Sequence, residues 1–270
     1  MTDILIEPQH IQCENLDQMD QVWTRPVTLI DRKLHYCPGC GHSVAHRLIM
    51  ETIDELNIQE TTIGVAPVGC SVFAYHYMDI DMQEAAHGRA TAVATGIKRV
   101  LPDRIVFTYQ GDGDLAAIGT AETIHTINRG ENIVIIFVNN GIYGMTGGQM
   151  APTTLPGFVT STSPNGRDTH TMGYPLKMAE MISVLPGAYY VTRQAVHSAK
   201  SVRKAKKAIL KAFQYQMDGK GGTSFVEIVS NCPSGWKMTP VESNQYLDDE
   251  IFDFYELGDL KLPPKESKSE

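Results

Sequence analysis

The sequence of 270 residues contains no apolar run that approaches the roughly 20 residues of a membrane-spanning helix. Its apolar runs, such as residues 133–138, are far shorter. Basic residues are not in excess, since the formal net charge is −8, which argues against a general nucleic-acid-binding protein. The opening stretch Met-Thr-Asp-Ile-Leu-Ile-Glu-Pro lacks the basic and apolar segments of a secretory signal. We therefore expect a cytoplasmic protein that binds neither a membrane nor nucleic acid.

Cysteine is also scarce, with five residues in the chain, which excludes a small protein held together by disulfides. In a reducing compartment such residues are more typical of ligands or catalysts. Cys37 and Cys40 form a C-x-x-C, Cys70 and Cys232 stand singly further on, and Cys13 lies apart in a polar N-terminal stretch. An isolated C-x-x-C is compatible with zinc binding, dithiol redox chemistry or an iron–sulfur cluster.

The composition, 42% hydrophobic and 20% charged, is that of a globular protein with a sizeable core. Apolar periodicity predicts helices over 43–56, 89–100, 116–128, 175–185 and 198–214, and strands over 61–66, 104–110, 133–139, 188–193 and 223–230. Strands that alternate with helices predict an α/β fold, with a mostly parallel sheet covered by helices on both faces. We expect an N-terminal arm over 1–35, a main domain over 36–240 and a C-terminal tail over 241–270.

Polar and cysteine side chains follow four of the predicted strands directly: Cys70, Asp112, Asn140 and Cys232. Ligands of parallel α/β sheets bind outside the carboxyl ends of the strands. Four segments that are far apart in the sequence are therefore expected to meet at one edge of the sheet.

The segment Gly-Asp-Gly-Asp at 111–114 precedes a predicted helix and strand, after which comes Asn-Asn-Gly-Ile at 139–142. Glycines let the backbone approach a phosphate closely, and the helix start offers free N–H groups to an anion. The Asp112 carboxylate and the Asn140 amide oxygen are hard ligands that suit Mg²⁺. A simple turn also explains Gly-Asp-Gly-Asp by itself, but not its pairing with Asn-Asn. A phosphate-binding loop of the Gly-x-x-x-x-Gly-Lys-Ser/Thr type is absent.

This pair of motifs resembles the thiamine diphosphate signature, Gly-Asp-Gly followed by Asn-Asn. Together with Cys-Pro-Gly-Cys-Gly-His at 37–42, His-Gly-Arg-Ala at 87–90 and Asn-Cys-Pro at 231–233, the motif order is similar to that of 2-oxoacid:ferredoxin oxidoreductase beta subunits, over about residues 25–245. The resemblance implies a thiamine diphosphate-binding fold, in which Asp112, Asn140 and the Ile142 carbonyl hold Mg²⁺. The implied cofactor-binding residues are Gly41, His42, His87, Gly88, Arg89, Gly111, Asp112, Gly113, Asp114, Asn140, Ile142, Tyr143, Gly144, Met145 and Thr146.

The resemblance also implies that Cys37, Cys40, Cys70 and Cys232 hold a [4Fe–4S] cluster, for which four thiolates are the usual ligand set. Four thiolates suit structural zinc as well, and the spacing alone leaves both open. The adjacent thiamine motif favours the cluster, because a cluster accepts single electrons from a cofactor intermediate whereas zinc has no redox chemistry.

Three side chains have a second interpretation. His42 begins a helix and is expected at the diphosphate, although a capping or core histidine has the same pattern. His87 and Arg89 are expected at a phosphate or a substrate carboxylate, although a surface turn with a salt bridge also fits. Relatives often carry Lys where Gly147 stands, which leaves the substrate open.

The resemblance implies oxidative decarboxylation of a 2-oxoacid, of the branched-chain or 2-oxoglutarate type, with coenzyme A, to give acyl-CoA, CO₂ and reduced ferredoxin. The chain has a single diphosphate motif, so we expect an alpha subunit to supply the glutamate at the aminopyrimidine, with gamma and delta subunits as further candidate partners. One alternative is a non-oxidative thiamine diphosphate-dependent decarboxylase or transferase subunit with structural zinc. Another is a non-catalytic iron–sulfur electron-transfer module.

The predicted helix 198–214 carries a run of basic residues: Lys200, Arg203, Lys204, Lys206, Lys207 and Lys211. An acidic ferredoxin could dock on them, but a solvated helix face is the simpler interpretation.

Overall fold

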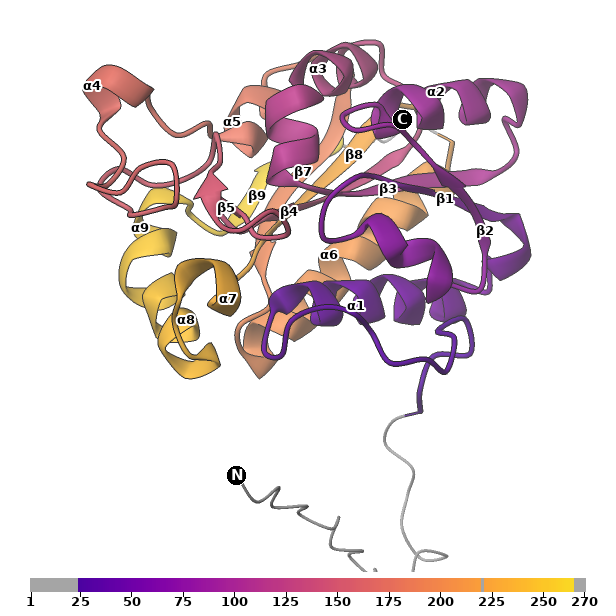
Figure 1. The fold of residues 1–270 in the computed structure, drawn as a ribbon. Coiled ribbons are helices and arrows are strands. Elements are labelled where there is room, and N and C mark those ends of the chain that lie inside the picture. Colours follow the sequence, from indigo (N-terminus) through magenta and orange to yellow (C-terminus); the bar gives the residue numbers. More distant parts are fainter. Residues whose placement is uncertain (1–23, 220, 265–270) are drawn as a thin grey trace, which may run out of the picture.

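A computed structural model describes residues 24–219 and 221–264. Its main element is a seven-stranded sheet in the order β2-β1-β3-β4-β8-β7-β9 (Figure 1). All neighbouring pairs are parallel except β7 and β9, which are antiparallel. The strands are β1 (Thr62–Ala66), β2 (Asp81–Glu84), β3 (Ile105–Gly111), β4 (Val134–Asn139), β7 (Ala188–Ala195), β8 (Thr223–Val229) and β9 (Gly258–Lys261). The prediction of a mostly parallel α/β fold is confirmed.

Helices cover both faces of this sheet (Figure 1). Helices α1 (Gly41–Leu56) and α6 (Ala199–Met217) lie on one face, and α2 (Ala90–Val100), α3 (Thr120–Asn128) and α5 (Met178–Ser183) lie on the other. Strand β4 is buried throughout, and its alternate residues pack into two hydrophobic cores. Val134, Ile136 and Val138 join the core beneath α1 and α6, whereas Ile135 and Phe137 join the opposite one.

Short elements complete the chain and connect the larger ones. They are the 3₁₀ helices η2 (Gln59–Thr61) and η3 (Val72–His76), the π-helix η4 (Gly113–Ile118), the small strand pair β5 (Ile142–Tyr143) and β6 (Gln149–Met150), and α4 (Thr169–Met172). Within the described residues, no helix combines the length and the apolarity that crossing a membrane requires.

Some strands and helix bounds differ from the sequence-based expectation. Strands β2 and β9 were not predicted, because both lie at sheet edges and lack a buried apolar face that would show as periodicity. The helix expected over 116–128 is preceded by η4, so helical structure begins directly after Asp112. The helix expected over 175–185 is shorter and runs over Met178–Ser183, and the Leu176 N–H donates to the Pro152 carbonyl at 3.0 Å, outside the helix.

The C-terminal segment differs from the tail expected over 241–270. It folds as α8 (Pro240–Tyr246), η5 (Leu247–Ile251) and α9 (Phe252–Phe254) and ends in β9, and α7 (Pro233–Trp236) precedes it. Leu247, Ile251 and Tyr255 pack with Ile142 and Cys232 in a third apolar cluster. This segment therefore supports the edge of the sheet where the predicted site residues lie.

Only the last part of the expected N-terminal arm belongs to the described residues. Leu29 forms an isolated bridge with Met78 and packs against the core beneath α1. Cys13 lies outside the described residues.

Candidate cofactor site

A cleft of about 260 Å³ lies where the chain leaves the carboxyl ends of β1, β3 and β4. Most of the predicted cofactor residues line it, namely His42, His87, Gly111, Asp112, Gly113, Asp114, Asn140, Ile142, Tyr143, Gly144, Met145 and Thr146. Cys70 lines it as well. Gly41, Gly88 and Arg89 are the predicted residues that are not part of its wall. The chain thus assembles the site at the sheet edge, as the pattern of residues after strands predicts.

The predicted magnesium ligands converge at one side of this cleft. The Asp112 carboxylate accepts hydrogen bonds from the Gly113 N–H at 2.8 Å and the Ile142 N–H at 3.1 Å. In one orientation of the Asn140 amide, its oxygen lies 2.8 Å from the Ile142 carbonyl oxygen and 3.2 Å from Asp112 Oδ2. In the opposite orientation, the amide nitrogen takes that position and donates to both oxygens.

Asp112 is 4% exposed, and this burial raises the pKa of its carboxyl to about 7. The hydrogen bonds from Thr153, Gly113 and Ile142 act in the opposite direction, because they favour the ionised form. A cation beside the carboxylate would add to that second effect and keep the group ionised at neutral pH. Asp112 therefore has the environment of a carboxylate that is completed by a positive charge.

Three residues outside the predicted set hold Asp112 and the backbone of Asn140 in place by hydrogen bonds. The Thr153 hydroxyl donates to Asp112 Oδ2 at 3.1 Å, and the Trp236 indole N–H donates to the Asn140 carbonyl at 3.0 Å. The Tyr255 hydroxyl donates to the Thr153 carbonyl at 2.8 Å. The C-terminal helices thereby hold the predicted magnesium ligands in place.

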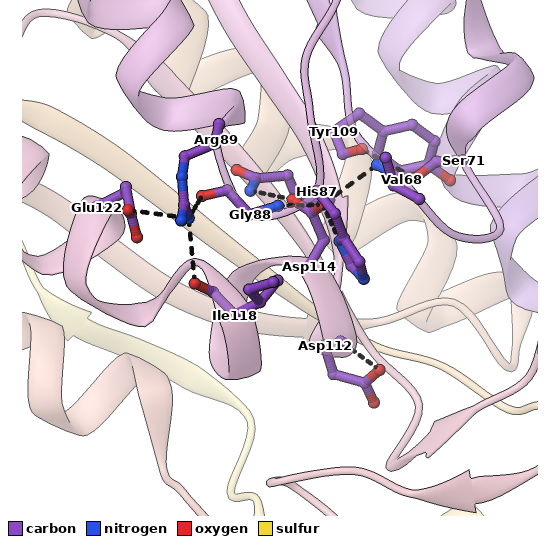
Figure 2. A network of polar contacts seen from close by, with 12 residues as sticks. Val68, Ser71, His87, Gly88, Arg89, Tyr109, Asp112, Asp114, Ile118 and Glu122 are labelled. Carbon is purple, nitrogen blue, oxygen red and sulfur yellow. Dashed lines mark hydrogen bonds and ion pairs between the residues drawn. The ribbon is translucent and has the colours of Figure 1, made fainter.

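Asp114 lines the cleft as well, but both of its carboxylate oxygens are already hydrogen-bonded within the chain. Its Oδ1 accepts from His87 Nδ1 at 2.7 Å, the Gly88 N–H at 2.9 Å and the Val68 N–H at 3.2 Å. Its Oδ2 accepts from the Gln110 side-chain amide at 2.7 Å. Figure 2 shows these groups gathered around the one carboxylate. Asp114 therefore joins the loops after β1 and β2 to the end of β3.

Arg89 points away from the cleft. Its guanidinium lies 2.9 Å from the Glu122 carboxylate and 3.3 Å from the Ile118 carbonyl (Figure 2). This arrangement matches the surface salt-bridge interpretation of the sequence. Gly88 has a φ of +77°, and a β-carbon there would lie within 2.8 Å of the Gly119 nitrogen, so the turn that carries His87 requires glycine.

His42 is 1% exposed, and burial lowers its pKa to about 4, so its ring is neutral near pH 7. The Tyr109 hydroxyl donates to the His42 carbonyl at 3.0 Å and lies 2.9 Å from His42 Nδ1. With the hydroxyl hydrogen on the carbonyl, Nδ1 is the donor and Nε2 carries a lone pair. A contact between Nε2 and a phosphate oxygen requires the other tautomer.

The four predicted cluster cysteines lie behind the same cleft, and none of them forms a disulfide. Burial raises the pKa of the Cys40 thiol to about 11 and those of Cys70 and Cys232 to about 12, and Cys40 adds to the rise at both of the others. A β-carbon on Gly144 would lie 3.0 Å from Cys232 Sγ and 3.8 Å from Cys70 Sγ. These segments, distant in sequence, are thus brought together, while Cys37 is exposed beside them.

Asn231 fastens two of the cysteine loops to each other. Its side-chain oxygen accepts from the Gly41 N–H at 3.0 Å, and its side-chain nitrogen donates to the Gly39 carbonyl at 3.0 Å. The donor set of four thiols fits a soft metal centre that binds them as thiolates. Among the described residues, no group of three or more His, Cys, Asp or Glu side chains is arranged to hold a single metal ion.

Sequence reasoning missed other parts of the cleft wall, including Val68, Gly69, Ala117 and Ile118. Glycine and apolar residues in a loop or in η4 carry no chemical signal, so only the folded chain identifies them. Thr153 also gave no signal, because it reaches Asp112 from a loop that follows β6.

Comparisons with known proteins agree with this geometry. Residues 67–228 match the family model of the C-terminal TPP-binding domain of thiamine pyrophosphate enzymes. The chain is 48% identical to ketoisovalerate oxidoreductase subunit VorA of Methanothermobacter marburgensis over 235 residues, which are 87% of this chain and 49% of that protein. It is 42% identical to 2-oxoglutarate synthase subunit KorB of Methanocaldococcus jannaschii over 207 residues, 76% of this chain and 72% of that one.

A solved structure is similar too, that of 2-oxoglutarate:ferredoxin oxidoreductase from Magnetococcus marinus with 2-oxoglutarate, coenzyme A and succinyl-CoA bound. The TM-score is 0.70 at 27% identity, over 82% of this chain and 71% of that one. Fold and site therefore define a thiamine pyrophosphate-binding domain. The chain belongs to the family of 2-oxoacid:ferredoxin oxidoreductase beta subunits, and it spans about half the length of the VorA proteins that it matches.

Proposed function

We propose that this chain is the beta subunit of an enzyme that oxidatively decarboxylates a 2-oxoacid with coenzyme A and ferredoxin. In this function it binds thiamine diphosphate, Mg²⁺ and a [4Fe–4S] cluster. A branched-chain 2-oxoacid is the first candidate substrate, since the identity to the ketoisovalerate subunit is 48% and that to the 2-oxoglutarate subunit is 42%. The cytoplasm stays the predicted compartment, without a membrane or nucleic acid as partner.

The observation that carries the proposal is the cluster of oxygens at Asp112, Asn140 and Ile142. An octahedral Mg²⁺ with oxygen ligands at about 2.0–2.1 Å places neighbouring ligands about 2.9 Å apart. With the Asn140 amide oxygen turned toward them, the two other oxygens lie 2.8 Å and 3.2 Å away, which is the spacing of neighbouring ligands of the ion. In the opposite orientation the amide nitrogen donates to both oxygens, so the residues fit the ion and are also held together when it is not bound.

The chain's residues bind and orient the cofactor in this proposal. The cofactor supplies the covalent chemistry when bound, by holding the electrons released on decarboxylation. Asp112, Asn140 and the Ile142 carbonyl would hold Mg²⁺, which joins the diphosphate to the protein. A β-carbon on Gly113 would lie 3.1 Å from the Tyr143 ring, so glycine at this position avoids a close contact inside the cleft.

The cysteine region supports the iron–sulfur part of the proposal, with structural zinc as the alternative. Cys40 raises the pKa of Cys70 and of Cys232, so the three thiols lie near one another, and Cys70 lines the cleft itself. A redox group at this place could take up single electrons from the bound cofactor, which zinc could not. An alpha subunit is proposed to supply the glutamate at the aminopyrimidine and the rest of the substrate pocket.

The experiment that tests this function uses the complex purified from its native source. We expect viologen reduction that depends on both coenzyme A and one of ketoisovalerate, 2-oxoglutarate or pyruvate, together with iron and acid-labile sulfide. Asp112→Ala should abolish the activity, whereas Asp218→Asn, an exposed carboxylate at the end of α6, should not change it. Stoichiometric zinc without iron, or turnover without viologen reduction, would favour the non-oxidative alternative. Absence of thiamine diphosphate binding would leave the electron-transfer module.

A further inference from the structure

A second hollow, of about 530 Å³, lies away from the cofactor cleft, between α6 and the segment from η5 to β9. Exposed lysines line it on the side of α6, spaced four, three and four residues apart: Lys200, Lys204, Lys207 and Lys211. Because this spacing follows the helical period, the four side chains form one row, here named the lysine row. At 1.5 Å per residue the row extends about 16 Å along the helix.

The lysine row is not ion-paired in the part of the chain that the structure describes. Within residues 24–219 and 221–264, none of its four members forms an ion pair within 4 Å, whereas Lys206 lies 3.4 Å from Glu51 and 3.0 Å from Glu55 of α1. Two carboxylates also line the hollow, but their nearest polar partners are not the lysines. Asp248 lies 3.1 Å from His197, and Asp259 accepts the Tyr190 hydroxyl at 3.0 Å. Like charges four residues apart destabilise a helix, so an unpaired row is a cost that an anionic partner would relieve.

One end of the lysine row lies beside the cysteine region. A β-carbon on Gly41, the residue after Cys40, would lie 2.9 Å from Val196, and Val196 directly precedes His197 of the hollow. Helices α1 and α6 pack together and run in the same direction, because Gly41 meets the start of α6 and Glu51 meets its middle. Lys200 is therefore the member of the row nearest to Cys40 along the helix.

We propose that the lysine row is the docking surface for an acidic, ferredoxin-type electron carrier, an inference that rests on the function proposed above. A chain with a net charge of −8 repels an acidic protein over most orientations, so one local positive row selects the orientation in which the carrier approaches. That orientation places the carrier at the start of α1 and α6, next to Cys40. The docked carrier is reduced by one electron while the cluster is oxidised by one, and no bond forms or breaks.

The first test is chemical cross-linking of the whole complex with an acidic bacterial-type ferredoxin. A carbodiimide joins lysine amines directly to carboxylates, and we expect peptides of α6 that contain Lys200, Lys204 or Lys207 to be linked to the ferredoxin. Cross-links to the ferredoxin at other lysines alone contradict the proposal. Cross-links of the row to the alpha subunit alone identify it as a subunit interface instead. This result does not depend on turnover.

The second test compares two double variants of the same helix in the complex. Lys204→Gln with Lys207→Gln removes two charges of the row, and Arg203→Gln with Lys206→Gln removes two from the side that faces α1. The first should raise the KM for ferredoxin about fivefold at low ionic strength and less in salt, because screening weakens steering. Its rate with methyl viologen, which needs no docking, should stay unchanged, and the second variant should stay within about twofold of the native complex.

The two proposals fail in different ways. An unchanged KM in the first variant, equal changes in both variants, or a parallel fall in the viologen rate overturns the docking surface. A native complex that reduces no viologen with any 2-oxoacid overturns the proposed function, and the cross-links then still decide whether the row binds the carrier.

Discussion

The candidate site contains pairs of residues of the same type, in which one member is held inside the chain and the other faces the cleft. We call these two sets the inner layer and the outer layer. The carboxylate of Asp114 and the amide of Asn139 are hydrogen-bonded inside the chain, and His46 lies behind the cleft with its Nδ1 beside the Tyr36 hydroxyl. Asp112, Asn140 and His42 line the cleft, where Asp114 also reaches its wall. Asn139 donates to Glu227 at 2.8 Å, and Glu227 in turn lies 3.0 Å from Arg193. The inner member of each pair is part of the scaffold, and the outer member presents an oxygen or nitrogen atom to the cleft.

The largest effect that can test this division concerns Asp114. Asp114→Ala leaves the donors of Val68, Gly88 and Gln110 without their acceptor, and each buried unpaired group costs about 1–3 kcal/mol. We expect a loss of about 3–5 kcal/mol in the free energy of unfolding, measured by chemical denaturation. An unchanged stability would show that Asp114 belongs to the outer layer.

Asp112→Ala should have a smaller effect on stability. It leaves the donors of Gly113, Ile142 and Thr153 without their acceptor, but it also removes a buried carboxyl whose desolvation is unfavourable, so the free energy of unfolding without cofactor should fall less than in Asp114→Ala. Thiamine diphosphate affinity in the presence of Mg²⁺ should fall at least about 100-fold, since a charge-assisted ligand to the ion is lost. Calorimetric titration measures this change. Wild-type affinity in this variant would remove Asp112 from the metal site.

The histidines differ in their response to pH. Burial lowers the pKa of His46 to about 3 and that of His42 to about 4, so the unfolded chain binds more protons than the folded chain below pH 6.5. Stability that is present above pH 6.5 is therefore lost as the pH falls. For His46 the loss between pH 6.5 and 5 is about 2 kcal/mol.

His46→Leu should reduce this acid sensitivity without affecting cofactor binding, because His46 does not line the cleft. Denaturation curves at pH 7 and pH 5 measure the difference. Equal slopes for the variant and the native chain would contradict the assignment of His46 as a buried neutral group.

The smallest effect concerns Thr153, which links the two layers. Thr153→Val removes the hydroxyl that donates to Asp112 Oδ2 at 3.1 Å and keeps the volume of the side chain. A hydrogen bond to a charged group contributes about 1.5 kcal/mol to the interaction that it supports. Mg²⁺-dependent cofactor affinity should therefore fall about tenfold at most. If affinity is unchanged, the position of Asp112 is set by the Gly113 and Ile142 N–H groups alone.

The sequence predicts the outer layer better than the inner one. Cys70, Asp112 and Asn140 follow apolar strands, and their chemistry stands out against those strands. Asp114 has the same residue type and the same motif as Asp112, so only the folded backbone distinguishes a tie from a ligand. Arg89 shows the same limit, because its choice of Glu122 depends on how η4 and α3 are placed.

The C-terminal segment was the hardest part to predict. In residues 241–262, Leu247, Ile251 and Tyr255 stand at helical spacing, but acidic side chains lie between them, the helices that form are short, and strand β9 is a short edge strand. Their fold depends on Leu247, Ile251 and Tyr255 meeting Trp236 and Ile142, which are contacts across long stretches of sequence.

Gly144 determines how closely the cofactor cleft and the cysteine region can approach each other. It lines the cleft on one side, and on the other it lies against the sulfurs of Cys70 and Cys232. If the cofactor and the cluster bind as proposed, a single stretch of backbone at Gly144 separates them. A methyl group added there would lie 3.0 Å from Cys232 Sγ, so a larger residue at this position would displace the sulfur of Cys232.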